Sequence, residues 1–175
     1  ITEALLELAQ VIADINEDQI KTKLYIQSAS ADQIIINRLR EYSFVVINPV
    51  AEYHHLPLVY SDADILVIVN DFDDESVRFL RYSMPTKASE YMISGTPILV
   101  YAHKQTAISK FFSANDCGCC VTEHNPEKLK NAILLLLNDE EYRKKLSLNA
   151  VRLASKLFDA DKVRKEFQSL LNNLL

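Results

Sequence analysis

Glycine is almost absent from this sequence, which contains only Gly95 and Gly118 among its 175 residues. The glycine-rich loops that bind dinucleotides or nucleoside triphosphates need several closely spaced glycines, because the backbone must approach the phosphates. The sequence therefore contains neither a Gly-x-Gly-x-x-Gly turn nor a Walker phosphate loop. Any phosphate group bound by these residues must be held in another way.

Excess positive charge and long apolar runs are also missing. The chain has 19 Lys and Arg against 24 Asp and Glu, a net charge of −5, whereas nucleic-acid binding depends on many cations that neutralise phosphates. The longest apolar run, residues 132–137, is far shorter than the roughly 20 residues of a transmembrane helix. The first residues are acidic and amphipathic, unlike an export signal. We expect no nucleic-acid partner, no transmembrane segment and a cytoplasmic location.

Cysteines are few and clustered, at positions 117, 119 and 120. Their spacing fits neither a disulfide framework nor a zinc site of paired C-x-x-C motifs, so we expect buried thiols in a strand and no bound metal. With 49% hydrophobic and 25% charged residues, the composition is that of one globular domain that spans residues 1–175.

Helical and strand patterns alternate along the chain. Strand patterns occupy residues 23–29, 44–50, 64–70, 96–102 and 118–123, and helical patterns fill most of the intervals and residues 126–175. The run "DILVIVN" is apolar on both faces, as in a central parallel strand, and residues 71–83 read as a polar loop. The pattern predicts an α/β fold: a Rossmann-like parallel sheet of five to six strands with helices on both faces. Ligands of such sheets bind at the carboxyl ends of the strands.

The segment "SMPTKASEYMISGTP", residues 83–97, places polar groups at such a strand end. It predicts a helix that is capped by Ser83 or Met84, carries Pro85 in its first turn and ends at Gly95. The free amides and the dipole of a helix start attract a phosphate group. Thr86 adds a hydroxyl donor to this end of the helix.

Lys87 and Glu90 lie on one face of the predicted helix, three residues apart. Lys87 would bind phosphates, and the Glu90 carboxylate would accept hydrogen bonds from two vicinal hydroxyl groups, such as those of a ribose. An ordinary exposed ion pair, worth a few tenths of a kcal/mol, is the alternative on spacing alone.

The segments "SDADILVIVN" and "SMPTKASEYMISGTPILVYA" resemble the nucleotide-sugar-binding half of GT-B fold glycosyltransferases, especially the large group called family four. The family pattern there is P-x-K-x-x-E-Y-M/L-x-x-G-x-P-I/V. This sequence matches it at Pro85, Lys87, Glu90, Tyr91, Met92, Gly95, Pro97 and Ile98. The resemblance extends from about Leu24 to the carboxy-terminal helices.

The resemblance implies a role for several residues. Glu90 would bind the ribose of a nucleotide diphosphate sugar, the start of its helix would face the diphosphate, and Asn48, Pro49 and Val50 would lie beside the base. Many family members carry a second glutamate eight residues earlier, but Tyr82 occupies that position here. Glu75 and Arg78 are the nearest candidates to hold the donor sugar, and the resemblance assigns no catalytic residue.

The resemblance also implies that these residues form the carboxy-terminal domain of a two-domain enzyme, which is inactive without its amino-terminal, acceptor-binding domain. That enzyme would transfer a glycosyl group from the nucleotide sugar to a glycan or other hydroxyl acceptor without a cofactor, and the other domain would allow a membrane-peripheral location. Two alternatives remain open: a nucleotide-sugar epimerase of the same architecture and a non-catalytic, receiver-like α/β interaction module.

Two other groups of polar residues offer competing sites. The acidic run "NDFDDE", with Asp71, Asp73, Asp74 and Glu75, could hold Mg²⁺ near Lys104 as in a receiver site, but a solvated acidic loop is the preferred interpretation. His54 and His55 could be general bases, but adjacent histidines point to different faces of a helix, so surface or packing roles are preferred. His103, at a strand end, could contact phosphate or only solvent.

Overall fold

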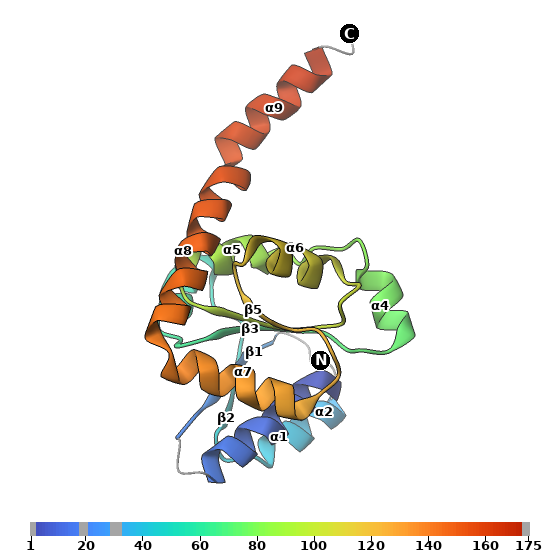
Figure 1. Ribbon diagram of the computed structural model, residues 1–175, viewed down its shortest axis with the longest axis vertical. Helices are drawn as coiled ribbons and strands as arrows, with labels where there is room; N and C mark the ends of the chain where they lie inside the picture. The colour runs from blue at the N-terminus through green and yellow to red at the C-terminus, as the bar shows by residue number, and fades with distance from the viewer. Residues whose placement is uncertain (1–2, 18–20, 29–32, 173–175) are drawn as a thin grey trace.

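The computed structural model describes residues 3–17, 21–28 and 33–172. Helices and strands alternate through most of this length, as the sequence predicts (Figure 1). In chain order the elements are α1 (Glu3–Glu17), β1 (Leu24–Gln27), α2 (Gln33–Arg40), β2 (Val45–Asn48), η1 (Tyr53–His55), α3 (Leu56–Ser61), β3 (Leu66–Val69), α4 (Asp74–Leu80), α5 (Lys87–Ser94), β4 (Ile98–Tyr101), α6 (Ala107–Asn115), β5 (Cys119–Val121), α7 (Pro126–Asn138), α8 (Glu140–Leu157) and α9 (Ala160–Asn172).

The strands form two parallel sheets, β1–β2 and β3–β4–β5. Leu24 pairs with Val45 in the first sheet, and Leu66 pairs with Ile98 in the second. The parallel α/β class is therefore confirmed, with five strands in the described residues. The expected single sheet is divided, because β1 and β3 have no ladder between them in the described part of the chain. Strand patterns in a sequence identify strands but do not say which of them pair.

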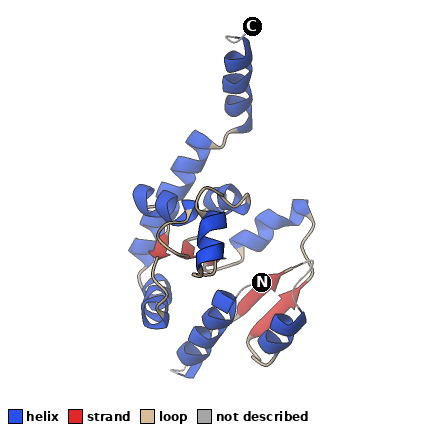
Figure 2. Ribbon diagram, turned by 90° about the vertical axis from the view of Figure 1, so that its right-hand side faces the viewer, coloured by secondary structure: helices blue, strands red, loops and turns tan. Residues whose placement is uncertain are grey.

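Helices cover both faces of the three-stranded sheet. Helices α1 and α7 pack on one face, in a core cluster that also receives the apolar side chains of β1 and β2. Helices α5, α6 and α8 pack on the other face, together with Tyr60 of α3. Figures 1 and 2 show these layers from two directions. The common cluster under α1 and α7 joins the two sheets into one body.

The centre of the larger sheet is β4 rather than β3. All four residues of β4 are buried, and β4 pairs with β3 on one side and β5 on the other. The prediction of a central strand at residues 64–70 was therefore wrong. A strand is apolar on both faces when helices cover both faces, whatever its position in the sheet. Helices cover both faces of β3, although in the described residues it pairs with β4 alone.

Residues 71–83, predicted as a loop, contain helix α4. Asp73 caps it, since its Oδ1 accepts a hydrogen bond from the Ser76 N–H at 2.9 Å. Asp74 and Glu75 lie in the first turn and Arg78 in the last, where each charge is favourable to the helix dipole. These are ordinary start and stop signals of a helix, and the acidic composition of the segment obscured them.

The last helix, α9, leaves the body of the molecule. Helix α8 packs against α5, and α9 extends outward with every described residue exposed (Figure 2). None of the described helices has the length and hydropathy of a bilayer span.

Candidate functional site

Helix α5 starts slightly later than the sequence predicts. The expected cap was Ser83 or Met84 with Pro85 in the first turn, but Thr86 occupies the capping position and its side chain makes no capping hydrogen bond. The N–H of Ala88 donates to the carbonyl of Pro85 at 3.0 Å, so a tighter turn precedes the regular helix. Such i to i+3 turns are common where helices begin.

The start of α5 lies at the edge of the sheet where strands end. Gly95 terminates the helix in the left-handed conformation, with φ of 79°, as the sequence predicts. Only Thr96 and Pro97 separate it from β4, so this end of α5 lies near the start of that strand. The opposite end of the helix, with Thr86 and Lys87, therefore lies toward the carboxyl ends of β3 and β4.

Glu90 is held by a tyrosine from another helix. The hydroxyl of Tyr60, on α3, donates a hydrogen bond to Glu90 Oε2 at 2.9 Å. The Tyr60 ring meets the Tyr91 ring edge to face, with centroids 5.0 Å apart, and its carbonyl accepts a bond from the Thr96 hydroxyl at 2.7 Å. Burial and the bond to Glu90 raise the pKa of Tyr60, so its hydroxyl remains a donor at neutral pH. The half-buried carboxylate of Glu90 is thus fixed in place.

Lys87 does not pair with Glu90. No ion pair joins the two side chains in the part of the chain that the structure describes. The Lys87 Nζ lies 6.0 Å from the centre of the Tyr91 ring, within the range of a weak cation–π contact. Although the residue is exposed to solvent, neighbouring protein atoms lower the pKa of Lys87. Because the Lys87 ammonium does not pair with Glu90, it is free to meet an anion, and the Glu90 carboxylate is not occupied by it.

The other predicted site residues lie on the segments that surround this helix. Glu75 and Arg78 are exposed on α4, beside an open hollow of about 600 Å³ that both residues line. Tyr82 and Ser83 are exposed in the connection between α4 and α5. Among the described residues, no hydrogen bond or ion pair joins any of these four to Glu90.

The loop that follows β2 carries the three residues predicted beside a base. Asn48 ends β2 and is half-buried, and its carbonyl accepts a bond from the Ser28 N–H at 3.3 Å. Pro49 and Val50 are exposed. The neighbouring Ala51 N–H donates to Gln27 Oε1, which ties this loop to the end of β1.

A larger open groove, of about 1050 Å³, runs beside α1. Its lining contains one arginine, Arg38, one histidine, His124, and many carboxylates: Glu3, Glu7, Asp14, Glu41, Asp71 and Asp73. This charge would repel a diphosphate, so size alone does not make the groove the anion site. Two of its carboxylates also have structural roles, because Asp71 accepts a bond from the Ala4 N–H at 2.9 Å and Asp73 caps α4.

A comparison with protein families identifies the class of this chain. Residues 8–152, from within α1 into α8, match the family described as "Glycosyl transferases group 1". The chain belongs to the group 1 glycosyl transferases. Comparison with curated protein sequences gives no significant match.

Solved structures show the fold that this group 1 chain shares. Sucrose-phosphate synthase (tll1590) from Thermosynechococcus elongatus superposes with a TM-score of 0.75 at 20% identity, over 98% of this chain and 42% of that protein. Anabaena HepE (Alr3699), solved with UDP and glucose, gives 0.68 at 15% identity, over 95% and 44%. WaaG, a glycosyltransferase involved in lipopolysaccharide biosynthesis, gives 0.59 at 16%, over 85% and 37%.

The chain thus spans less than half the length of each of these proteins. Its architecture is the Rossmann-like half of a GT-B fold, as the sequence resemblance implied.

Two polar residues of this group 1 domain, Tyr60 and Asn70, were not singled out from the sequence, although Asn70 begins a loop that was expected to line the site. Tyr60 lies 30 residues before Glu90, and only the packing of α3 beside α5 brings them together. Asn70 follows β3, and its side-chain Nδ2 is buried with no hydrogen-bond partner in the described residues. A polar residue at the end of a buried strand was the available signal for Asn70, whereas no spacing in the sequence indicates Tyr60.

Proposed function

We propose that this chain is the donor-binding domain of a glycosyltransferase, and that Glu90 binds the ribose hydroxyls of a nucleoside diphosphate sugar. The observation that carries the proposal is the bond from Tyr60 to Glu90. It leaves the second carboxylate oxygen of Glu90 available and holds it near the start of α5. A carboxylate that is held in one position distinguishes a ribose with two vicinal hydroxyls from a sugar that lacks one of them better than a mobile carboxylate does.

The diphosphate would lie against the start of α5. The first amides of a helix lack intrahelical partners and carry partial positive charge, and Thr86 and Lys87 add a hydroxyl and an ammonium. When the sugar–phosphate bond breaks, negative charge grows on the departing nucleoside diphosphate. Donors aimed at that charge stabilise the transition state more than the bound donor, so these groups would act on the leaving group directly.

The remaining predicted residues complete the proposed donor site. The base would lie beside Asn48, Pro49 and Val50, and the sugar would lie toward Glu75 and Arg78 on α4. The acceptor, a glycan or another hydroxyl compound, would be bound by an amino-terminal domain outside these 175 residues. The family match supports glycosyl transfer over the receiver-like alternative, and the use of Asp71 and Asp73 as helix caps leaves fewer carboxylates for a receiver-type magnesium site.

Titration with UDP, GDP and their 2′-deoxy analogues tests the proposal. We expect Glu90→Gln to weaken nucleotide binding by about 1 to 3 kcal/mol, the usual range for a lost hydrogen bond to a charged group. We also expect the wild-type protein to prefer ribose over 2′-deoxyribose, and the variant to lose most of this preference, because the two changes remove the same interaction.

Glu127→Gln is the matched control. Glu127 is also a first-turn glutamate, of α7, and is exposed, so its variant should bind UDP as the wild-type protein does. If Glu90→Gln keeps both its affinity and its preference for ribose while its melting temperature is unchanged, Glu90 does not bind the ribose.

A further inference from the structure

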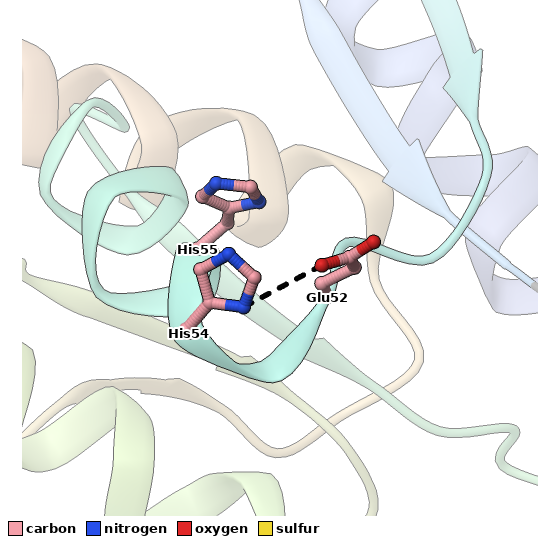
Figure 3. A group of neighbouring side chains, drawn as sticks. All are labelled: Glu52, His54 and His55. Atoms are coloured by element: carbon pink, nitrogen blue, oxygen red, sulfur yellow. Dashed lines mark ion pairs between the residues drawn. The ribbon is translucent and has the colours of Figure 1, made fainter.

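Three potential metal ligands meet on the turn that follows β2. Suitable ligand atoms of Glu52, His54 and His55 all lie within 4.8 Å of one another. His54 Nδ1 is 3.5 Å from Glu52 Oε2, and the centroids of the two imidazole rings are 3.9 Å apart. Figure 3 shows the three side chains on the same side of this turn. No other group of three or more His, Cys, Asp or Glu with such spacing occurs among the described residues.

A tight turn at η1 brings Glu52 next to the two histidines. His55 N–H donates to the Glu52 carbonyl at 2.8 Å, and the backbone changes from extended at Glu52, with φ of −62° and ψ of 147°, to a 3₁₀ helix at residues 53–55. Adjacent residues are about 100° apart around an α-helix and about 120° apart around a 3₁₀ helix, so the two histidines were expected on different faces. Their rings nevertheless approach each other, with centroids 3.9 Å apart and a tilt of 46°.

The chemistry of this group selects a class of ion. Two imidazole nitrogens and one carboxylate oxygen suit Zn²⁺, Cu²⁺ or Ni²⁺, whereas Mg²⁺ and Ca²⁺ prefer oxygen ligands alone. Ligands about 2.1 Å from a tetrahedral zinc ion are roughly 3.4 Å from each other, close to the 3.5 Å that separates His54 Nδ1 from Glu52 Oε2. The ligand atoms of all three residues lie within 4.8 Å of one another, so the group is already close to the spacing that one ion requires.

We propose that Glu52, His54 and His55 bind one divalent transition-metal ion of the zinc type. Water fills the remaining coordination positions, because all three residues are exposed and no fourth protein ligand joins the group within the described chain. The site is accordingly one of moderate affinity, from which the ion exchanges with solvent. It does not include Glu90 or Lys87, and it begins two residues after Val50, which the proposed function places beside the base.

Isothermal titration of the whole chain with Zn²⁺, in a buffer that does not bind metal, tests this site. We expect one ion per chain and saturation at micromolar to submillimolar zinc. His54→Gln and His55→Gln should each weaken binding at least tenfold, and the double variant should lose it. His124→Gln is the matched control, because His124 is an exposed histidine next to a single carboxylate, with its Nε2 3.1 Å from Glu7, and its variant should bind like the wild-type protein.

A second measurement uses the unmodified protein and does not depend on how the variants fold. Substoichiometric Cu²⁺ should broaden the NMR signals of the His54 and His55 rings before those of His103 and His124. Equal broadening of all four rings, undiminished zinc binding in the double variant, absence of binding at millimolar zinc, or displacement of zinc by millimolar Mg²⁺ would each overturn the proposal.

Discussion

The two sheets of this domain are both parallel, but helices cover them to different extents. Every residue of β4 is buried, and β3 and β5 alternate between buried and half-buried positions. In the smaller sheet, by contrast, all four residues of β2 are only half-buried, and the Tyr25 side chain of β1 is 62% exposed. Since stability follows the apolar surface removed from water, the larger sheet should be the more stable part.

Because of this difference, one part of the proposed donor site lies on a well-packed region and the other part on a less well packed one. Helix α5, with Lys87 and Glu90, packs on the well-covered sheet, whereas the loop after β2 extends from the less covered one. Helix α3 connects them: it follows η1 in the chain, and its Tyr60 reaches Glu90. We therefore expect the ribose and phosphate contacts to be preorganised, and the contacts to the base to be more adaptable.

A matched pair of valine substitutions gives the largest expected contrast. Val100 in β4 is fully buried, so Val100→Ala removes two buried methyl groups and leaves a cavity. We expect it to lower the free energy of unfolding by about 2 to 3 kcal/mol. Val46→Ala, in half-buried β2, should cost about 1 kcal/mol or less. Urea denaturation measures both values, and equal losses would show that the two sheets are equally well packed.

A packing change next to β5 should have the second largest effect. A Cβ atom added at Gly118 would lie 2.5 Å from Phe112 Cδ1 and 3.1 Å from the carbonyl oxygen of Ile98. Phe112 is fully buried and has little space to move, so Gly118→Ala should destabilise the protein by about 1 to 3 kcal/mol. Ala114→Ser, at an exposed position of α6, should change stability by less than about 0.5 kcal/mol. A Gly118→Ala variant as stable as this control would contradict the tight packing.

Much of the fold could be predicted because local signals agree with it. The five strand segments, the glycine cap at Gly95 and the burial of Cys117 and Cys119 follow from patterns within a few residues. Cys119 and Cys120 lie in β5 as predicted, but Cys117 precedes this strand and Cys120 is only half-buried. Burial raises the pKa of Cys117 to about 12 and that of Cys120 to about 11. The position of Lys87 and Glu90 on one helix also follows from spacing alone.

The parts that were not predicted depend on contacts between distant segments. The division into two sheets depends on which strands pair, and the Tyr60 bond depends on the packing of α3 against α5. The approach of the His54 and His55 rings, with centroids 3.9 Å apart, depends on side-chain conformation, because adjacent residues of either kind of helix start on different faces. In each case the decisive information lies in tertiary structure or in side-chain conformation.

Removal of the Tyr60 hydroxyl tests the connection between the two regions. Tyr60→Phe keeps the ring that packs on Tyr91 but loses the bond to Glu90. We expect UDP binding to weaken by about 1 kcal/mol, or roughly fivefold, because the carboxylate is no longer fixed. Tyr25→Phe, on the exposed face of β1, is the control and should bind UDP normally. If Tyr60→Phe binds as well as this control while Glu90→Gln does not, Tyr60 has no role in positioning Glu90.

The smallest effect is expected on the stability of α4. Val77 is the buried residue of this helix, and neither sheet packs extensively against it. The bond from Ser76 lowers the pKa of Asp73 below the ordinary aspartate value. Asp73 therefore stabilises α4 at neutral pH, and this contribution disappears as the pH falls through the lowered pKa. Asp73→Ala should reduce the hydrogen-exchange protection of α4 amides at pH 7, and the difference from wild type should vanish in strong acid.

Asp73→Asn, which can still cap the helix, should show little pH dependence, since a neutral amide does not titrate. A difference between Asp73→Ala and wild type that persists unchanged in acid would mean that the carboxylate charge does not stabilise the helix.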